Sequence, residues 1–291
     1  MVVPEVRKPS QSAVLTAVAR ELHRREAPPL ALDDTLALAL GGDDATRLVD
    51  TLERELSREA LLAFSRWVCV RARVPEDVVA RAVEDGVDQY VILGAGLDSF
   101  AYRRGDLRER LRIFEVDHPA SQAWKRRRLE ELGVALPPQL VFVPADFEHQ
   151  TLAAALSAAA FDHRKRAVYS WIGVTMYLTV EAIRATLATI ASGAPGTSVV
   201  LTYNRPPSAL TGAALETEQG LRSILTGMGE PMISMFEPPE IEALVRSEGF
   251  DHVTHFGPEE GLRTYFPGRE DVRLLGVQRI IIATVTAAHT V

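Results

Sequence analysis

The chain has 291 residues, of which 47% are hydrophobic, and carries a formal net charge of −7 at pH 7. This length can bury a full core, either as one large domain or as a core domain with a cap. The acidic balance makes nucleic acid a poor partner. The one dense basic run, "WKRRRLEEL" at 124–132, is followed at once by glutamates and is expected to form a solvated helix face.

A single cysteine, Cys69, lies in an apolar helical stretch, which argues against a disulfide framework and against a cysteine metal site. The first residues contain no apolar segment suited to export, and no apolar run reaches the length needed to span a bilayer. These features predict a cytoplasmic protein that has neither a metal centre nor a membrane partner. No feature of the sequence indicates an oligomeric state.

Residues 10–86 show helical patterns such as "SAVLTAVARELHRRE" and "LSREALLAFSRWVCVRAR", separated by Pro28-Pro29 and Gly41-Gly42. No run in this part has the alternation or the β-branched content of a strand. We therefore expect an N-terminal helical cap over residues 1–86.

From Gln89 onward, short β-rich runs alternate with helical ones. The runs expected to form strands are 89–94, 111–117, 140–146, 166–173, 197–204, 251–256 and 277–287. Strand–helix alternation with continuously apolar strands is typical of a doubly wound, mostly parallel α/β sheet. We expect this core to occupy residues 87–291, with an insertion at about 205–236 after the fifth strand.

In such sheets, ligands bind beyond the carboxyl ends of the strands. Gly94-Ala95-Gly96 follows the first strand, where glycines permit unusual backbone angles and remove Cβ atoms that would block a ligand. An ordinary tight turn has the same composition. Ser99 stands where the third glycine of a G-x-G-x-x-G motif would be, which weakens a dinucleotide interpretation.

Acidic residues follow the next two strands. Asp117 lies about twenty residues beyond the glycines, where an acid typically accepts hydrogen bonds from ribose hydroxyls; a carboxylate capping the helix near Pro119 is the alternative. Asp146 could accept from an adenine amino group, and Phe147 offers a backbone N–H and an apolar face, although Asp146 alone is no better than a helix cap. Together the three strand ends suggest one bound adenosine.

A resemblance to a known family covers nearly the whole chain and includes the motifs "VRARVPEDVV", "VILGAGLDSFAYR", "FEVDHP", "ADFEH", "WIGVTMYLT" and "GEPMISMFEPPEIEALV". In these motifs the chain resembles the leucine carboxyl methyltransferase-like family of S-adenosylmethionine-dependent methyltransferases, in particular its actinobacterial small-molecule branch. The resemblance implies a class I methyltransferase fold, with a seven-stranded sheet and a helical cap. It also implies S-adenosylmethionine as the cofactor and a carboxylate or hydroxyl oxygen as the usual methyl acceptor.

The resemblance also implies roles for single residues. Arg73, with Arg71 as its neighbour, matches the arginine that pairs with the cofactor's carboxylate, a task suited to the guanidinium fork. Tyr177 matches a tyrosine near the transferred methyl group, with core packing as the alternative. The remaining matches concern the cofactor's methionine part (Gly94, Ala95, Gly96), its ribose (Asp117) and its adenine (Asp146, Phe147).

One position departs from the family pattern. The family usually has an acidic residue where this chain has Ile172, whose side chain cannot accept a hydrogen bond. The cofactor's ammonium group would then be held by backbone carbonyls, at reduced strength. This departure leaves open a non-catalytic protein that binds S-adenosylmethionine.

The expected activity is O-methylation of a small-molecule carboxylate or hydroxyl, as in secondary metabolism. A carboxylate needs no base, and none of the seven histidines stands where a base is expected. The insertion contains Met228, Met232, Met235 and Phe236, which suit either a lid over an apolar substrate or simple core packing. The alternative, an NAD(P)-dependent oxidoreductase, is disfavoured by the missing third glycine and by the absence of a Tyr-x-x-x-Lys pair.

Overall fold

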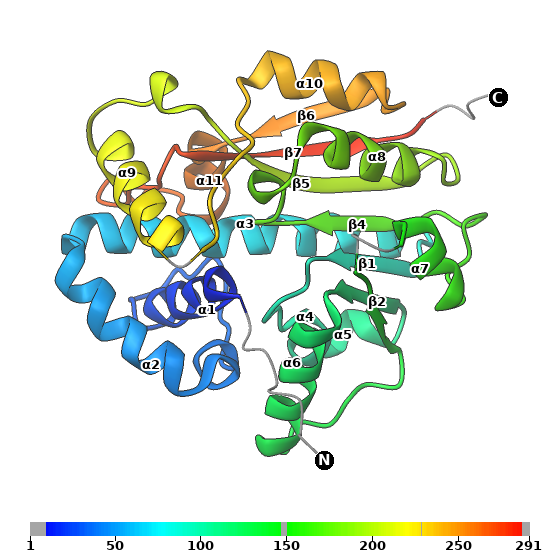
Figure 1. Ribbon diagram of the computed structural model, residues 1–291, viewed down its shortest axis with the longest axis horizontal. Helices are drawn as coiled ribbons and strands as arrows, with labels where there is room; N and C mark the ends of the chain where they lie inside the picture. Colours follow the sequence, from blue (N-terminus) through cyan, green and yellow to red (C-terminus); the bar gives the residue numbers. More distant parts are fainter. Residues whose placement is uncertain (1–9, 147–149, 228, 287–291) are drawn as a thin grey trace.

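The computed structural model describes residues 10–146, 150–227 and 229–286. They form a seven-stranded sheet in the order β3-β2-β1-β4-β5-β7-β6 (Figure 1), so the predicted sheet is confirmed. All pairings from β3 to β5 are parallel, whereas β7 is antiparallel to both of its neighbours. The strands are β1 (Gln89–Leu93), β2 (Arg112–Asp117), β3 (Leu140–Pro144), β4 (Val168–Trp171), β5 (Ser198–Asn204), β6 (His252–Phe256) and β7 (Gln278–Thr284).

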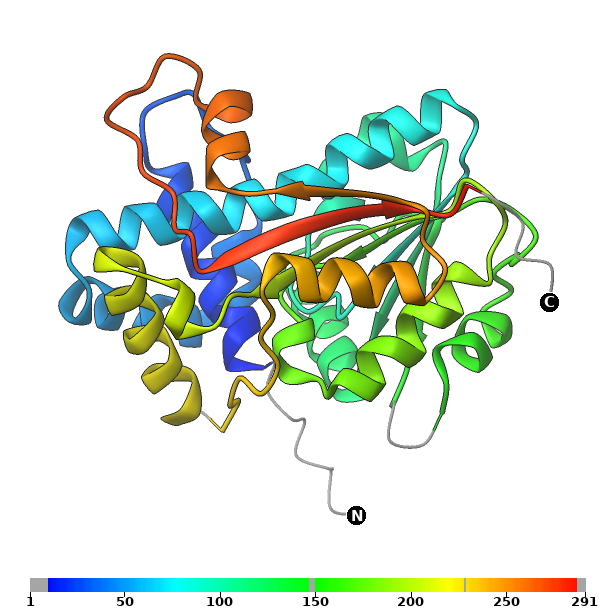
Figure 2. The ribbon, with the colours of Figure 1, turned by 90° about the horizontal axis from the view of Figure 1, so that it is seen from above.

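Alternate residues of the central strands pack on opposite faces of the sheet, as the period of two requires. Val91 and Phe114 belong to the core formed with α7 (Leu152–Ala158), α8 (Val180–Ala191) and α10 (Pro238–Ser247). Tyr90 and Ile113 face the other side and pack with α4 (Phe100–Arg103), α5 (Gly105–Arg108) and the end of α3 (Arg58–Glu84). Because helices cover both faces, the central strands β1 and β4 are buried along their whole length. Figure 2 shows the sheet between these layers.

The N-terminal segment consists of α1 (Gln11–Arg24), α2 (Ala37–Glu55) and α3 (Arg58–Glu84). The first half of α3 packs with α1 and α2 in one apolar cluster, and its second half packs on the sheet. Helix α3 therefore contributes to both the cap and the core (Figure 1). Although α2 and α3 are long, no helix in the described ranges is apolar enough over a sufficient length to cross a bilayer.

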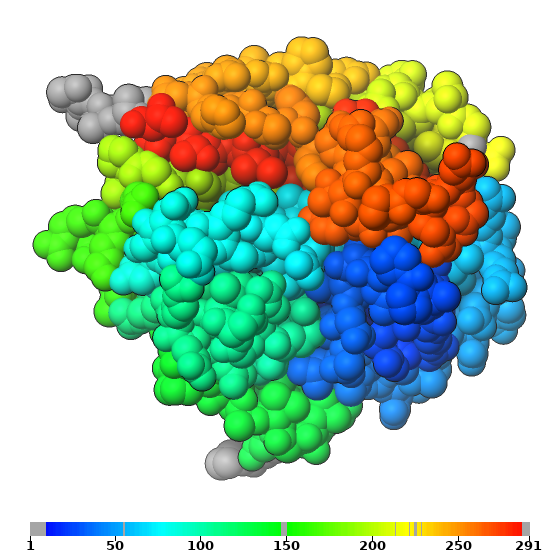
Figure 3. Space-filling view, turned by 180° about the vertical axis from the view of Figure 1, so that it is seen from behind, coloured from blue at the N-terminus to red at the C-terminus, as the bar shows by residue number. Residues whose placement is uncertain are grey.

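The segment after β5 contains η2 (Pro207–Ala209) and α9 (Gly212–Gly227). We call it the insertion, as in the sequence analysis. Helix α9 lies beside the N-terminal helices in both ribbon views (Figures 1 and 2). On the opposite side, α11 (Pro258–Tyr265) and the segment that follows it lie against the N-terminal helices (Figure 3). There the Tyr265 hydroxyl donates to Asp77 over 2.7 Å, and Phe266 stacks edge-on to His23.

The basic run at 124–132 lies mostly in α6 (Pro119–Glu131), but this helix is not only a solvated face. Lys125 is buried and pairs with the equally buried Glu115 of β2 over 2.7 Å. Burial raises the pKa of Glu115 to about 7, against the opposing effect of the Lys125 charge. The lysine is thus committed to the core, because an unpaired Glu115 would carry a large desolvation cost.

Candidate active site

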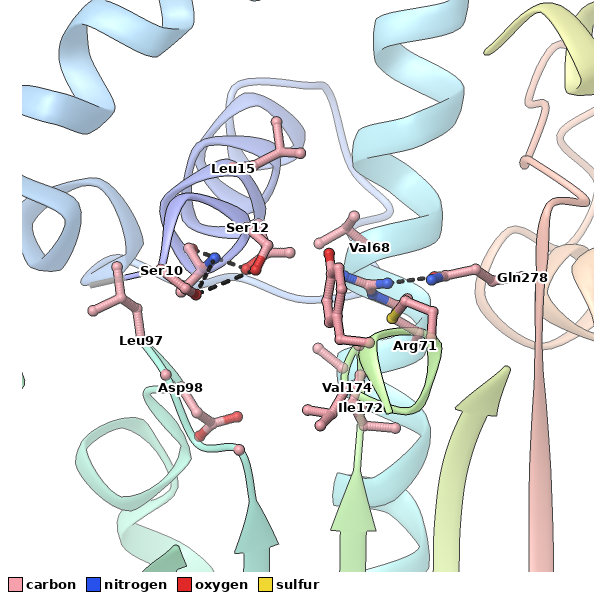
Figure 4. Close-up of a pocket in the computed structure, with 18 of the residues that line it drawn as sticks. Ser10, Ser12, Leu15, Val68, Arg71, Leu97, Asp98, Ile172, Val174 and Gln278 are labelled. Atoms are coloured by element: carbon pink, nitrogen blue, oxygen red, sulfur yellow. Dashed lines mark hydrogen bonds between the residues drawn. The ribbon is translucent and has the colours of Figure 1, made fainter. Parts of the chain in front are cut away.

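A cavity of about 650 Å³ opens at the carboxyl ends of β1, β2 and β4, where the order of the strands reverses. Helices α1 and α3 form one wall, and residues 229–233 after α9 contribute another. Figure 4 shows Arg71 and Val68 of α3, Ser12 and Leu15 of α1, and Ile172 after β4 around this space. This is the place where ligands bind in doubly wound sheets.

The glycine turn after β1 lines the cavity, and its backbone conformation favours glycine at two positions. Gly94 has φ +66° and Gly96 has φ +46°. A Cβ on Gly94 would lie 2.5 Å from Cγ2 of Val174, and one on Gly96 would lie 3.2 Å from Cβ of Ala13. The nearest atoms are thus protein atoms, so these glycines allow close packing of α1 and of the loop after β4. Ala95 lines the cavity between them.

Asp117 ends β2, lines the cavity and supports the glycine turn. Its Oδ2 accepts a hydrogen bond from the Gly96 N–H, and its Oδ1 accepts one from the His118 N–H over 2.6 Å. Burial raises the pKa of Asp117, although these N–H groups act in the opposite direction. The helix that follows is capped by His118, whose Nδ1 accepts from the Ala120 N–H, and not by Asp117.

The two residues predicted to hold adenine are only partly placed. Asp146 does not lie among the described residues that line the cavity, and its Oδ2 lies 4.0 Å from Nε2 of His118, which does. Phe147 lies outside the described residues, as does Met228 of the insertion. An adenine contact at Asp146 therefore stays a prediction.

Of the two arginines of α3, Arg71 lines the cavity and Arg73 does not. Arg73 is half-exposed and pairs with Asp77 over 2.7 Å, so its side chain points away from the cavity. Arg71 is buried and lines the cavity, with its guanidinium packed over Gly173. Two positions along a helix rotate a side chain by about 200°, so only one of the two can face inward.

Arg71 forms no ion pair within the described ranges, although it is buried. Burial lowers its pKa to about 10. Its Nη1 donates to Oε1 of Gln278 (Figure 4). The Nε2 of Gln278 in turn donates to Oδ1 of Asn204 over 2.7 Å. A buried guanidinium held in place by an amide, and without a carboxylate, is suited to bind an anionic group of a ligand.

The sequence analysis did not identify Gln278 and Asn204. Asn204 ends β5 and is paired in register with Gln278, which begins the antiparallel strand β7. In the sequence, each of these polar residues stands at one end of an apolar strand. This alone does not place the two side by side, because their proximity depends on the antiparallel pairing of β5 with β7.

Tyr177 and Ile172 both line the cavity on the segment that follows β4. Tyr177 ends the short helix η1 (Thr175–Tyr177), and its hydroxyl is hydrogen-bonded to the Ser12 side chain. Burial raises the pKa of Tyr177, so its hydroxyl stays protonated at neutral pH. Ile172 packs against the apolar cluster of the N-terminal helices.

Glu230, also missed from the sequence, joins the insertion to α1. Its Oε1 accepts from the Gln11 N–H over 2.7 Å, and its Oε2 accepts from the Ser12 N–H over 3.2 Å. The first turn of α1 has no acidic residue of its own, so Glu230 supplies the negative charge that a helix N-terminus favours. Glu230 lines the cavity together with its neighbours Gly229 and Pro231, so this contact holds the insertion against α1 beside the cavity.

Comparison with known proteins identifies this arrangement. Residues 13–191 match the family model described as leucine carboxyl methyltransferase. The chain belongs to the leucine carboxyl methyltransferase family. It is 31% identical over 283 residues to the Bacillus subtilis (strain 168) protein named "Putative S-adenosyl-L-methionine-dependent methyltransferase YktD", covering 90% of this chain and 93% of that protein.

Two further proteins are similar to this chain. A Mycobacterium tuberculosis (strain H37Rv) protein, Rv1896c, with the same description is 34% identical over 191 residues, covering 65% of this chain and 62% of that protein. The crystal structure of a Thermobifida fusca YX "putative methyltransferase" superposes with a TM-score of 0.60 and 19% identity, covering 99% of this chain and all of that one. At this identity the likeness shows the fold alone.

Membership of the leucine carboxyl methyltransferase family confirms four predictions: the family, the class I methyltransferase fold, the enzyme class and S-adenosylmethionine as the cofactor. The alternative of an NAD(P)-dependent oxidoreductase, which the sequence disfavours, is therefore not supported. The cavity fits the cofactor: Arg71, which has no ion-pair partner among the described residues, could bind its carboxylate, and Asp117 could accept from its ribose hydroxyls.

Proposed function

We propose that this methyltransferase transfers the methyl group to an oxygen of a small apolar molecule, in the first place to a carboxylate. The observation that carries the proposal is the surroundings of Tyr177, whose protonated hydroxyl faces a cavity with mostly apolar walls. Among the described residues, the histidine that lines this cavity is His118, beside Asp117. No other histidine of the described residues lines the cavity with Tyr177.

In this proposal the donor binds along the strand ends. Arg71 pairs with the cofactor's carboxylate, Asp117 accepts hydrogen bonds from the ribose, and Gly94 to Gly96 approach the methionine part. Asp146 and Phe147 keep the role predicted for them at the adenine. When bound, S-adenosylmethionine supplies an electrophilic methyl carbon on a sulfonium, and the protein's task is to hold an acceptor oxygen in line with it.

The acceptor would then lie between α1, α3 and residues 229–233. This part of the cavity is lined by Phe64, Trp67 and Val68 of α3. Met232, after α9, and Leu275, before β7, also line the cavity. Apolar side chains in a cavity of this size are typical of a site for a small molecule. We infer that the acceptor is such a molecule, of the kind made in secondary metabolism. The Tyr177 hydroxyl would donate to the acceptor carboxylate and orient it. An ionised carboxylate needs no proton removed, so no base has to be supplied.

The proposal is tested with labelled S-adenosylmethionine and a panel of apolar carboxylic acids, each paired with the alcohol of the same skeleton. Single-turnover methyl transfer is expected with at least one acid and not with its alcohol. Transfer to alcohols or phenols alone would contradict a carboxylate acceptor. Binding of S-adenosylhomocysteine without transfer to any member of a broad panel would favour a protein that binds the cofactor without catalysis.

A further inference from the structure

A buried polar cluster joins the N-terminal helices to the glycine turn. Arg20 of α1 donates from Nη2 to the carbonyl oxygen of Leu97 over 2.8 Å, and its Nε lies 2.9 Å from Oδ2 of Asp34. The same Oδ2 accepts the Ser99 hydroxyl over 2.6 Å. We call Arg20, Asp34 and Ser99 the brace. Two of its members come from the cap and one from the turn that follows β1.

The brace is more than a surface ion pair. Asp34 and Ser99 are each 1% exposed and Arg20 is 7% exposed. The Nε of Arg103 donates to the Ser99 hydroxyl over 2.7 Å, and its Nη2 pairs with the buried Glu76. In such a buried network, removing one partner leaves the others unsatisfied, so its members hold one arrangement.

The brace acts directly on the segment that lines the cavity. Residues 94–98 all line it, and Leu97, whose carbonyl Arg20 binds, lies in this segment. Gly96 is packed against Ala13 of α1, so the same helix contacts the turn twice. Asp34 and Ser99 do not line the cavity. Any effect of these two on a ligand would therefore pass through the backbone of the turn.

We propose that Asp34 and Ser99, through Arg20, are positioning residues that hold the glycine turn in the form that binds S-adenosylmethionine. Docking of the N-terminal helices and binding of the cofactor are then coupled, although neither residue touches the cofactor. This inference rests on the proposed placement of the cofactor at the turn. Ser99, which stands at the position of the third dinucleotide glycine, thus has a task of its own.

The physical consequence is a change in apparent affinity. If the turn samples other conformations, the apparent dissociation constant is the intrinsic one divided by the competent fraction. Loss of the brace should lower that fraction and weaken cofactor binding. The Michaelis constant for S-adenosylmethionine should rise accordingly, while kcat at saturation stays close to the original, because the reacting groups are unchanged.

The test uses Ser99→Ala and Asp34→Asn in the full chain, with S-adenosylhomocysteine as the probe in calorimetry. We expect the dissociation constant to rise about fivefold for Ser99→Ala and at least about tenfold for Asp34→Asn. The amide has no charge to pair with Arg20, and with its oxygen toward Arg20 and Ser99 its NH2 group meets the Leu36 N–H, from which Oδ1 of Asp34 accepts a hydrogen bond. Hydrogen exchange of the amides of residues 95–99 should quicken in both. If Asp34→Asn does not fold, Ser99→Ala decides alone.

Thr197→Val is the matched control, because it removes another hydroxyl from a side chain that is 1% exposed, at the amino end of β5. It should lower the melting temperature without changing the dissociation constant. Unchanged affinity in the brace variants, while Asp117→Ala still weakens binding, would overturn the brace and leave the donor site standing. Unchanged affinity in all of them, Asp117→Ala included, would overturn the placement of the cofactor itself.

Discussion

The guanidinium of Arg71 donates a hydrogen bond to the side-chain oxygen of Gln278, which lies 207 residues further along the chain. Gln278 is itself held by Asn204, so an amide pair at the ends of β5 and β7 orients an arginine of α3. Amides can fix the direction of a guanidinium without neutralising it. The positive charge is thus kept available for a ligand carboxylate.

Arg71→Gln should weaken S-adenosylhomocysteine binding about 30-fold, since a charge-assisted hydrogen-bonded pair contributes roughly 2 kcal/mol. Binding of 5′-methylthioadenosine, which lacks the amino-acid part, should not change. Calorimetry with both ligands measures the difference. Arg73→Gln is the control on the same helix and should leave both affinities as they are. Equal losses for the two ligands would show that Arg71 supports the fold and not the carboxylate.

Asp117→Ala should weaken S-adenosylhomocysteine at least about tenfold, through the loss of charge-assisted bonds to the ribose. A dependence on pH should accompany this. Burial raises the pKa of Asp117, so on acidification the carboxylate takes up a proton at a higher pH than an ordinary aspartate. Affinity should therefore be complete near neutrality and decline as the pH falls through that raised pKa. A decline that persists in Asp117→Ala would assign it to another group.

Ile172→Glu restores the acidic residue usual in the family and should tighten cofactor binding by offering an acceptor to the ammonium group. Ile172 lines the cavity, so the new carboxylate can stay in contact with solvent or ligand. Calorimetry and the melting temperature of the variant measure the outcome. Weaker binding would indicate that the new carboxylate pairs with Arg71, which packs over the adjacent Gly173. A large loss of stability would show that this wall has been rebuilt around an apolar group.

Tyr177→Phe should slow single-turnover transfer more than it weakens S-adenosylhomocysteine binding, because the hydroxyl is proposed to act on the acceptor oxygen. With a carboxylate acceptor, the rate of the unmodified protein should be level from about pH 6 to 9. Below that range it should fall only as the acceptor's own carboxyl is protonated, near pH 4 to 5. A loss of rate near pH 6.5, removed by changing His118, would instead identify an imidazole base and a hydroxyl acceptor.

Glu230→Gln should loosen the contact between the insertion and α1, because an amide presents an N–H to one of two backbone donors and removes the charge at the helix N-terminus. The amides of Gln11 and Ser12 should exchange faster with solvent, and S-adenosylhomocysteine should dissociate more rapidly. Glu216→Gln, an exposed change in α9, is the control. Unaltered exchange at both amides would mean that the Glu230 side chain does not hold the insertion against α1.

Much of this architecture could be predicted from residue order alone. The switch from helical patterns to short apolar strands at Gln89 reflects burial of the strands on both faces, which acts on each strand locally. Gly94, Ala95, Gly96, Asp117, Ile172 and Tyr177 all line the cavity because each follows a strand, and parallel strands end at one edge of the sheet.

Only the tertiary structure determined which side of α3 faces the cavity and which residues far apart in the sequence come into contact. Arg71 and Arg73 are equivalent in the sequence, and the direction from which α3 packs on the sheet determines which of them faces the cavity. Gln278 and Glu230 reach it through antiparallel pairing of β7 and through docking of the insertion on α1. Such contacts join residues about two hundred positions apart. Their formation depends on the packing of whole elements, which no local pattern of side chains specifies.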